Sequence, residues 1–466
     1  MTSVVHLKSF NQPSPPSQAW LAILAFIAVT AIALLARAGG ILNLAFPIGA
    51  LAVGLFLFFR APILYLGFNW WIWFLSPLVA RFVEYQTGAL SSGLRIIIIA
   101  PYLVTLIAAI TFFRHLPRLS PKEGLPFFLA FAAMLYSFGV GLARGFPIVE
   151  VVQTLLTWIP GVFLGFHLLV NWKDYPAFQQ NTVKVFFWAV LVMGVYGVYQ
   201  YVVAPDWDRF WLTNATNLQL CCGWPEPYMM RVWSTLNFPF TFAYVMNACL
   251  LVLFSSQKSS NVIAIAAGLA SFLLSQVRGA WIGCLIGLTL LFVSLKSPGQ
   301  IRLMAMVVSI TTVLVPIVTM TPLSEAITGR LQTLSSVQED GSAIERQAIY
   351  AQNFDRVISD PIGQGMGGLK LIDAGLLDVF SVFGWIGLVA FAPSIFLLLL
   401  RLFQYPDSQI DPFIKASRAI LVSILLIASN NNALVLMPGV LFWGFAGMAI
   451  AGHKYYRNLY QEDILP

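Results

Sequence analysis

The stretch VIAIAAGLASFLLSQVRGAWIGCLIGLTLLFVSL, residues 262–295, decides the fold class of this chain. Its two apolar runs, 262–274 and 282–295, flank a short segment that contains Arg278. Because a cation this close to a bilayer core is costly, such an arginine indicates a functional site with an anionic partner. Few carboxylates stand near Arg278 in the sequence, so we consider a ligand as that partner.

The same pattern recurs along the whole chain. Of its 466 residues, 59% are hydrophobic and 10% are charged, whereas a soluble protein carries roughly 25% charged residues. Recurrent apolar runs of about 20 residues predict an all-α, polytopic integral membrane protein. We expect about 14 transmembrane helices (12–14). Their apolar cores are residues 19–36, 41–59, 61–80, 93–113, 125–143, 148–170, 183–204, 238–255, 261–275, 280–295, 303–320, 379–400, 415–430 and 436–452.

For the third of these segments, a helix at the membrane surface is an alternative to a span, because Trp70, Trp71 and Trp73 are typical of that location. The polar, Pro-rich start of the chain lacks the features of a cleavable signal. We therefore divide the chain into a cytoplasmic tail (1–18), transmembrane helices (19–204), an external loop (205–237), helices that carry Arg278 (238–320), a large external loop (321–378), three last spans (379–452) and a cytoplasmic tail (453–466).

The net charge of +7 fits the positive-inside bias of membrane proteins better than nucleic-acid binding. With both termini in the cytoplasm, eight of the nine lysines fall inside, and ten of the eleven outside cations are arginines. Orientation needs only positive charge, whereas bidentate recognition of phosphate or carboxylate needs the guanidinium group. The alternative is chance together with the general use of arginine at interfaces.

The sequence predicts no metal site and no cofactor, since zinc, P-loop and dinucleotide motifs are absent from it. Cys249 and Cys284 fall in apolar runs and are interpreted as packing residues. Cys221 and Cys222 are adjacent, which is not a usual metal or disulfide spacing. The loop 205–237 is rich in tryptophan, which stacks on sugars or, more often, lies at the headgroup level. These tryptophans are Trp207, Trp211, Trp224 and Trp233.

The large loop 321–378 is predicted to contain a helix. Ser342 and Glu345 form a capping box, and Pro361 ends the helix before a glycine-rich turn. Arg346 falls in its first turn, where an anion bound between the guanidinium and the free amides would be favourable. The alternative is a solvated arginine paired with a carboxylate. The expected apolar stripe is Ile344, Ala348, Ala351, Phe354 and Ile358.

Three segments together resemble the O-antigen ligase and O-antigen polymerase superfamily of bacterial envelope glycosyltransferases. They are Ser275–Trp281 (SQVRGAW) between two spans, Glu345–Arg346 in the large loop, and Asp360–Gly365 (DPIGQG) after it. The match covers roughly residues 260–400, and upstream only the hydropathy pattern agrees.

The resemblance implies transfer of a glycan from an undecaprenyl-diphosphate carrier to a hydroxyl of a glycan or lipid acceptor. It implies a multi-pass protein of the bacterial plasma membrane that acts at the outer face, with other polysaccharide-assembly membrane proteins as partners. Arg278 and Arg346 would stabilise the charge of the diphosphate leaving group without a metal. The expected substrate-binding residues are Trp281, Glu345, Arg330, Asp360, Gly363, Gly365 and Arg231.

The chain departs from the ligases of this superfamily at the base, because ligases have a histidine shortly after the glycine turn. The four histidines of this chain all fall near the cytoplasmic side of the expected topology. Asp373 is therefore the candidate base and Asp378 the second, although Asp373 also suits a cap of the next helix. This departure favours a polymerase or another glycan transferase over lipid A-core ligation.

Two other functions stay open. A transporter of a glycolipid or of a small anion such as bicarbonate would need a midplane site. Few charges fall deep in the predicted spans; Glu150 is the main exception, and a position at the end of its span is the alternative. A peptidoglycan polymerase of the shape, elongation and division class also has many spans and an external carboxylate. The Arg278 segment and the large loop before the last three spans fit this class less well.

Overall fold

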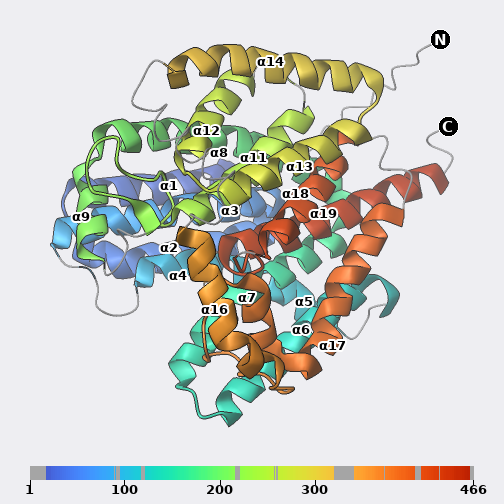
Figure 1. Ribbon diagram of the computed structural model, residues 1–466. Coiled ribbons are helices and arrows are strands. Elements are labelled where there is room, and N and C mark those ends of the chain that lie inside the picture. Colours follow the sequence, from blue (N-terminus) through green and yellow to red (C-terminus); the bar gives the residue numbers. More distant parts are fainter. Residues whose placement is uncertain are drawn as a thin grey trace.

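The computed structural model describes residues 17–88, 90, 95–116, 121–215, 221–256, 258, 261–319, 341–371, 373–404, 411–429 and 431–461. In these residues the regular structure is helical, apart from an isolated bridge between Gly223 and Met230 (Figure 1). The predicted all-α class is therefore confirmed.

Ten helices in the described part of the chain are long and apolar enough to cross a membrane, so the chain has the architecture of a multi-pass membrane protein. Two shorter apolar helices, α12 and α13, meet at the turn before Arg278. The ten candidate spans are α1 (Ser17–Leu35), α2 (Gly39–Arg60), α3 (Pro62–Thr87), α4 with α5 (Ile96–Leu106 and Ala109–His115), α6 (Pro121–Ala143), α7 (Ile148–Val170), α8 (Tyr175–Val203), α11 (Pro239–Ser256), α17 (Gly375–Gln404) and α19 (Leu436–Gln461).

The remaining helices account for the other predicted segments. They are α12 (Val262–Leu274), α13 (Arg278–Ser294), α14 (Ser297–Thr319) and α18 (Pro412–Ile427). Each of the fourteen predicted segments thus falls on a helix, although ten meet the length and hydropathy expected of a span. In the described residues, α9 (Asp206–Asn214) lies in the predicted loop 205–237, α16 (Gly341–Ile358) lies in the large loop, and a short 3-10 helix, η1 (Trp172–Asp174), joins α7 to α8.

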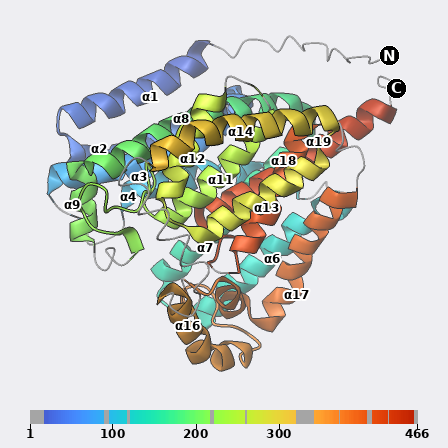
Figure 2. The same cartoon turned by 45° about the horizontal axis from the view of Figure 1, so that its top comes forward.

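Helix α3, whose tryptophans left a surface location open, belongs to the interior of the bundle. Trp70 is fully buried and Trp73 is nearly so. The Trp70 ring stacks on Phe445 of α19 and meets Phe186 of α8 edge-on. These aromatic rings fill the core, whereas α1 lies at the periphery of the bundle (Figure 2).

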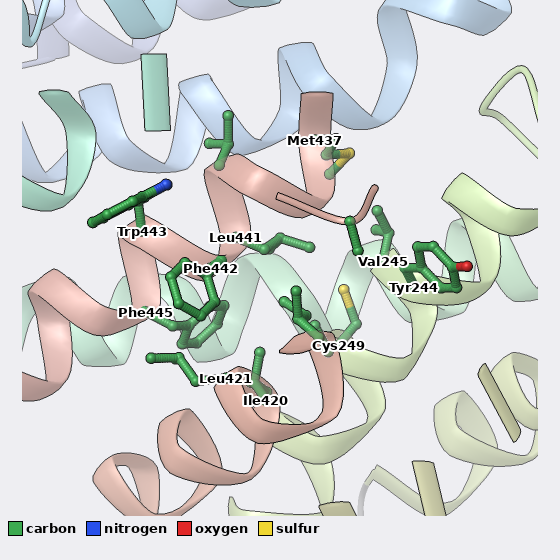
Figure 3. Packing of buried hydrophobic residues seen from close by; sticks show 14 of the residues in the cluster. Tyr244, Val245, Cys249, Ile420, Leu421, Met437, Leu441, Phe442, Trp443 and Phe445 are labelled. Atoms are coloured by element: carbon green, nitrogen blue, oxygen red, sulfur yellow. The ribbon is translucent and has the colours of Figure 1, made fainter. Parts of the chain in front are cut away.

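The centre of the bundle is the packing of α19 against α7 on one side and against α11 and α18 on the other. Glycine lets the backbones of α7 and α19 touch, because a Cβ atom at Gly165 would lie 2.3 Å from the Trp443 carbonyl oxygen. Small residues at helix contacts are typical of membrane proteins. Figure 3 shows the opposite face, where the Leu441 side chain of α19 points toward Val245 of α11.

Contacts divide the bundle into two ends. At one end, which we call the loop end, Asn432 donates to Asp378 (2.6 Å) and Arg81 pairs with Asp208 (2.7 Å). This end comprises α9, residues 221–238, the α12–α13 turn, the start of α17 and the α18–α19 connection. At the opposite end, the Lys415 ammonium donates to the Ser294 carbonyl (2.6 Å) and Lys454 pairs with Glu123 (2.6 Å).

The predicted helix of the large loop is present as α16, but its predicted apolar stripe is wrong. Ile344 and Phe354 are 54% and 49% exposed, and Ala348 and Ala351 are also exposed. The packed face instead carries Arg346, Ile349, Tyr350, Asn353 and Val357, of which Ile349, Tyr350 and Val357 join a small core with Leu371 and Leu377. Helical periodicity allows both stripes, and the apolar start of α17 selects the second.

Candidate functional site at the loop end

The Arg278 segment forms a tight turn between two helices. α12 ends at Leu274, and Arg278 is the first residue of α13. Gln276 has a φ of 57°, a left-handed conformation that is uncommon for a non-glycine residue. Val277 occupies the N-cap position, where its apolar side chain cannot satisfy the first amides of α13. Arg278 is half-buried at this helix start, where the Val277 side chain provides no capping hydrogen bond.

Arg231 holds this turn in place. Its Nε donates to the Ser275 carbonyl (3.2 Å), its Nη2 to the Gln276 carbonyl (3.3 Å) and its Nη1 to the Cys221 carbonyl (2.7 Å). The Val232 amide adds a backbone bond to the Leu274 carbonyl (3.1 Å). The predicted substrate-binding residue Arg231 thus contacts the backbone that positions Arg278.

A buried polar network supports the loop that carries Arg231. Arg81 of α3 pairs with Asp208 of α9, and both side chains are fully buried. The Arg81 guanidinium also donates to the carbonyls of Ser234 (2.6 Å) and Leu236. This ion pair ties α3 and α9 to the segment that follows Arg231.

Gln200 of α8 completes the network. Its amide nitrogen donates to Asp208 (2.7 Å), while its carbonyl oxygen accepts from the amides of Trp233 (3.0 Å) and Ser234 (2.8 Å). Tyr196 donates a further hydrogen bond to Asp208 (2.8 Å). Burial raises the pKa of Asp208, and the neighbouring Arg81 guanidinium opposes this shift. Three side chains from α3 and α8 therefore fix the buried carboxylate of Asp208 on α9.

Tyr244 connects the predicted arginine and the predicted base of the large loop. The charges of Asp373 and Arg346 both act on its hydroxyl group. Figure 3 shows the Tyr244 ring at the edge of the packed core, with the hydroxyl pointing away from it. Because Arg346 lies on the packed face of α16, it points toward the bundle.

Asp373 lies near both Tyr244 and Cys221. Its charge acts on Cys221 as well as on Tyr244, and Cys221 is bonded to Arg231 through its carbonyl. Arg346 and Asp373 therefore both lie near Tyr244, and Asp373 also lies near Cys221, whose carbonyl is hydrogen-bonded to the Arg231 side chain that holds the turn before Arg278. The three predicted catalytic residues share one region of the loop end.

Asp378, the second candidate base, has structural hydrogen bonds. Its carboxylate accepts from the Leu371 amide (3.0 Å) and from Asn432 (2.6 Å), so it ties the end of the large loop to the α18–α19 connection. Asp373 precedes α17 by two residues and is half-buried. The geometry favours Asp373 over Asp378 for a role in proton transfer.

The DPIGQG turn packs against α6 and α17. The Asp360 carboxylate accepts from Arg144 (2.7 Å) and from the Gly363 amide (3.2 Å). Gly363 and Gly365 have positive φ angles, and a Cβ atom at Gly365 would lie 2.4 Å from the Gly141 nitrogen. The structure thus uses three predicted substrate-binding residues, Asp360, Gly363 and Gly365, to seat the large loop on the bundle.

The other predicted residues differ in their surroundings. Trp281 donates weakly to the Phe272 carbonyl (3.4 Å) and so packs within the α12–α13 turn. Glu345 is exposed on α16, and Arg330 lies outside the described residues. Of the four loop tryptophans, Trp211 and Trp233 are buried and pack on each other, Trp207 donates to Tyr196, and Trp224 is exposed. Glu150 is exposed in the first turn of α7, at the end of the span.

Sequence reasoning missed Tyr244, Arg144 and the Arg81–Asp208 pair as parts of this region. Arg81 and Arg144 could be placed on the outer side, but their partners are 127 and 216 residues away in the chain. The available signal was the use of arginine at both positions. In the described residues, no three side chains of His, Cys, Asp or Glu are grouped as metal ligands.

Neither a protein-family model nor a curated protein matches this chain. The resemblance to the O-antigen superfamily therefore rests on the three quoted segments and on their order. The geometry of the loop end is the independent basis for a functional assignment.

Proposed function

We propose that this protein is a membrane glycosyltransferase with fourteen spans and with both termini in the cytoplasm of a bacterium. It transfers a glycan from an undecaprenyl-diphosphate carrier to an acceptor hydroxyl at the outer face of the plasma membrane. The observation that carries the proposal is the gathering of the Arg278 turn, Arg346 and Asp373 at one end of the bundle. The loop end is the outer face in this proposal.

The chemistry needs a site for developing negative charge. The acceptor oxygen attacks the anomeric carbon, the bond from this carbon to the diphosphate oxygen breaks, and its electron pair leaves with the diphosphate. Arginine is suited to this leaving group because its guanidinium donates two parallel hydrogen bonds to phosphate. The N-terminal end of the α13 helix dipole adds positive potential beside Arg278.

The two arginines have different roles in the proposal. Arg278 is held by a rigid turn near the apolar runs of α12 and α13, which suits a diphosphate attached to a lipid. Arg346 belongs to α16, which lies with the start of α17 at the lower edge of the bundle (Figures 1 and 2). It approaches the same region from the large loop.

Asp373 accepts the proton that the acceptor hydroxyl loses. Proton transfer by a positioned carboxylate is an established contribution to catalysis. Tyr244 and Cys221 line the region around Asp373. This arrangement supports Asp373, rather than the hydrogen-bonded Asp378, as the base.

The glycolipid profile of a deletion strain tests the proposal. Loss of a polymerase leaves single repeat units on the acceptor, whereas loss of a ligase leaves long glycan on the polyprenyl carrier. We expect the gene carrying Asp373→Asn to reproduce the deletion profile. Asp355→Asn, at an exposed position of α16, should restore the wild-type profile and is the matched control.

An unchanged profile in the deletion strain would contradict the proposal and would favour a transporter. Uptake of glycolipid or bicarbonate by liposomes without a polyprenyl donor would then be the test of that alternative.

A further inference from the structure

Two adjacent thiols lie beside the Arg231 contacts. The Cys221 and Cys222 sulfur atoms are 2.7 Å apart. Cys221 is half-buried, whereas Cys222 is fully buried. Cys249 and Cys284, by contrast, are buried in α11 and α13. The chain therefore offers one close dithiol and two separate cysteines for comparison.

The dithiol is joined directly to the Arg278 turn. The Cys221 carbonyl accepts from the Arg231 guanidinium (2.7 Å), and the Cys222 carbonyl accepts from the Arg231 amide (2.9 Å). The same guanidinium bonds the carbonyls of Ser275 and Gln276. A movement of the Cys221–Cys222 peptide is therefore passed to the turn through one side chain.

The two thiols differ in reactivity. A hydrogen bond from Cys222 lowers the pKa of Cys221, and the nearby Arg231 adds to this effect, while burial and Asp373 oppose it. The same hydrogen bond and burial raise the pKa of Cys222. Because the thiolate is the nucleophile, Cys221 is suited to attack an external disulfide and Cys222 to resolve the product.

We propose that Cys221 and Cys222 form a redox pair that closes to an intrachain disulfide and thereby loosens the hold of Arg231 on the Arg278 turn. The oxidant is an external disulfide, from a protein or a small molecule. The Cys221 thiolate attacks one of its sulfurs, forms a mixed disulfide and releases one thiolate. Cys222 then loses its proton and attacks the Cys221 sulfur, which releases the second thiolate.

This exchange conserves electrons. Two thiols are oxidised to one disulfide, and the external disulfide is reduced to two thiols. Disulfides form and persist outside the cytoplasm, so the biological role rests on the outward orientation of the loop end in the proposed function. The chemical step itself does not depend on that orientation.

Closure must alter the local backbone. A bond between adjacent cysteines creates a small ring that contains the Cys221–Cys222 peptide unit, and this unit resists rotation. The Cys221 carbonyl then changes direction relative to Arg231. Loss of its charge-assisted hydrogen bond frees the guanidinium and weakens its bonds to Ser275 and Gln276.

The test uses the purified full-length protein in detergent, treated with oxidised glutathione. In the wild type we expect the peptide that contains both cysteines to lose the mass of two hydrogens. Cys222→Ser should retain a glutathione adduct on Cys221, whereas Cys221→Ser should react slowly because Cys222 is buried. The double variant Cys249→Ser with Cys284→Ser should behave like the wild type.

Hydrogen–deuterium exchange of residues 275–281 is the second measurement. We expect oxidation to accelerate exchange in this segment by about tenfold, the size of one lost charge-assisted hydrogen bond, and dithiothreitol to reverse it. A stable glutathione adduct in the wild type, no loss of hydrogen, or unchanged exchange after oxidation would overturn the proposal. Neither measurement involves glycan transfer, so the redox proposal can fail or succeed independently of the proposed function.

Discussion

Arg278→Lys should lower the rate of glycan transfer by about 10²–10³-fold, the usual cost of removing one preorganised donor to a developing negative charge. Lysine keeps the positive charge but loses the planar pair of donors that binds phosphate. The neighbouring turn fixes the position of the donor group, so a shorter or rotated ammonium cannot reach the same oxygens. The measurement is glycan product formed per molecule of protein in membranes.

Protein level and folding must be equal for this comparison. Arg278 lies at the start of α13 and is half-buried, so its replacement by lysine should leave the thermal stability of the purified protein nearly unchanged. Arg356→Lys, at an exposed position in the last turn of α16, is the matched control and should keep full activity. Wild-type output from Arg278→Lys would show that the guanidinium is not needed.

Arg81→Ala should destabilise the protein by about 3–5 kcal/mol, the cost of leaving one partner of a buried ion pair without the other. Arg81 and Asp208 have no solvent exposure, so water cannot solvate the Asp208 carboxylate that is left without its partner. The carbonyls of Ser234 and Leu236 also lose their donor. The free energy of unfolding in detergent micelles measures this effect.

A double replacement separates charge from packing. Arg81→Met combined with Asp208→Leu removes both charges, so it should be more stable than Arg81→Ala alone. In Arg81→Ala, burial without the guanidinium raises the pKa of Asp208 further above its unfolded value. The folded state then binds more protons, so the variant should gain stability as the pH falls through that raised pKa. If the single and double variants lose the same free energy of unfolding, and neither loss depends on pH, the broken ion pair is not the cause of the destabilisation.

The fold could be predicted from hydropathy to a large extent. A bilayer requires long apolar helices, and each of the fourteen predicted segments falls on a helix, of which ten are long and apolar enough to cross a membrane. The interior location of α3 could not be predicted, because Trp70 and Trp73 suit either a core or a membrane surface. Only the neighbouring rings of α8 and α19 decide between these environments.

The candidate site could be predicted less well. The order of the motifs indicated Arg278, Arg346 and Asp373. The prediction of which face of α16 is packed was wrong, because two different stripes of residues both have the helical period. Asp360 and Arg231 are predicted to bind substrate, and the sequence did not indicate their contacts with Arg144 and with the Ser275–Gln276 turn. Such contacts join segments that are far apart in the chain, so local patterns do not contain them.

The most direct test of the central claim is glycan transfer by the purified protein in liposomes that contain an undecaprenyl-diphosphate oligosaccharide and an acceptor glycan. We expect each new glycosidic bond to release one free undecaprenyl diphosphate, and the Arg278→Lys protein to release almost none. An intact donor in the presence of folded wild-type protein, or equal donor consumption by the Arg278→Lys protein, would contradict the assignment of this site to glycan transfer.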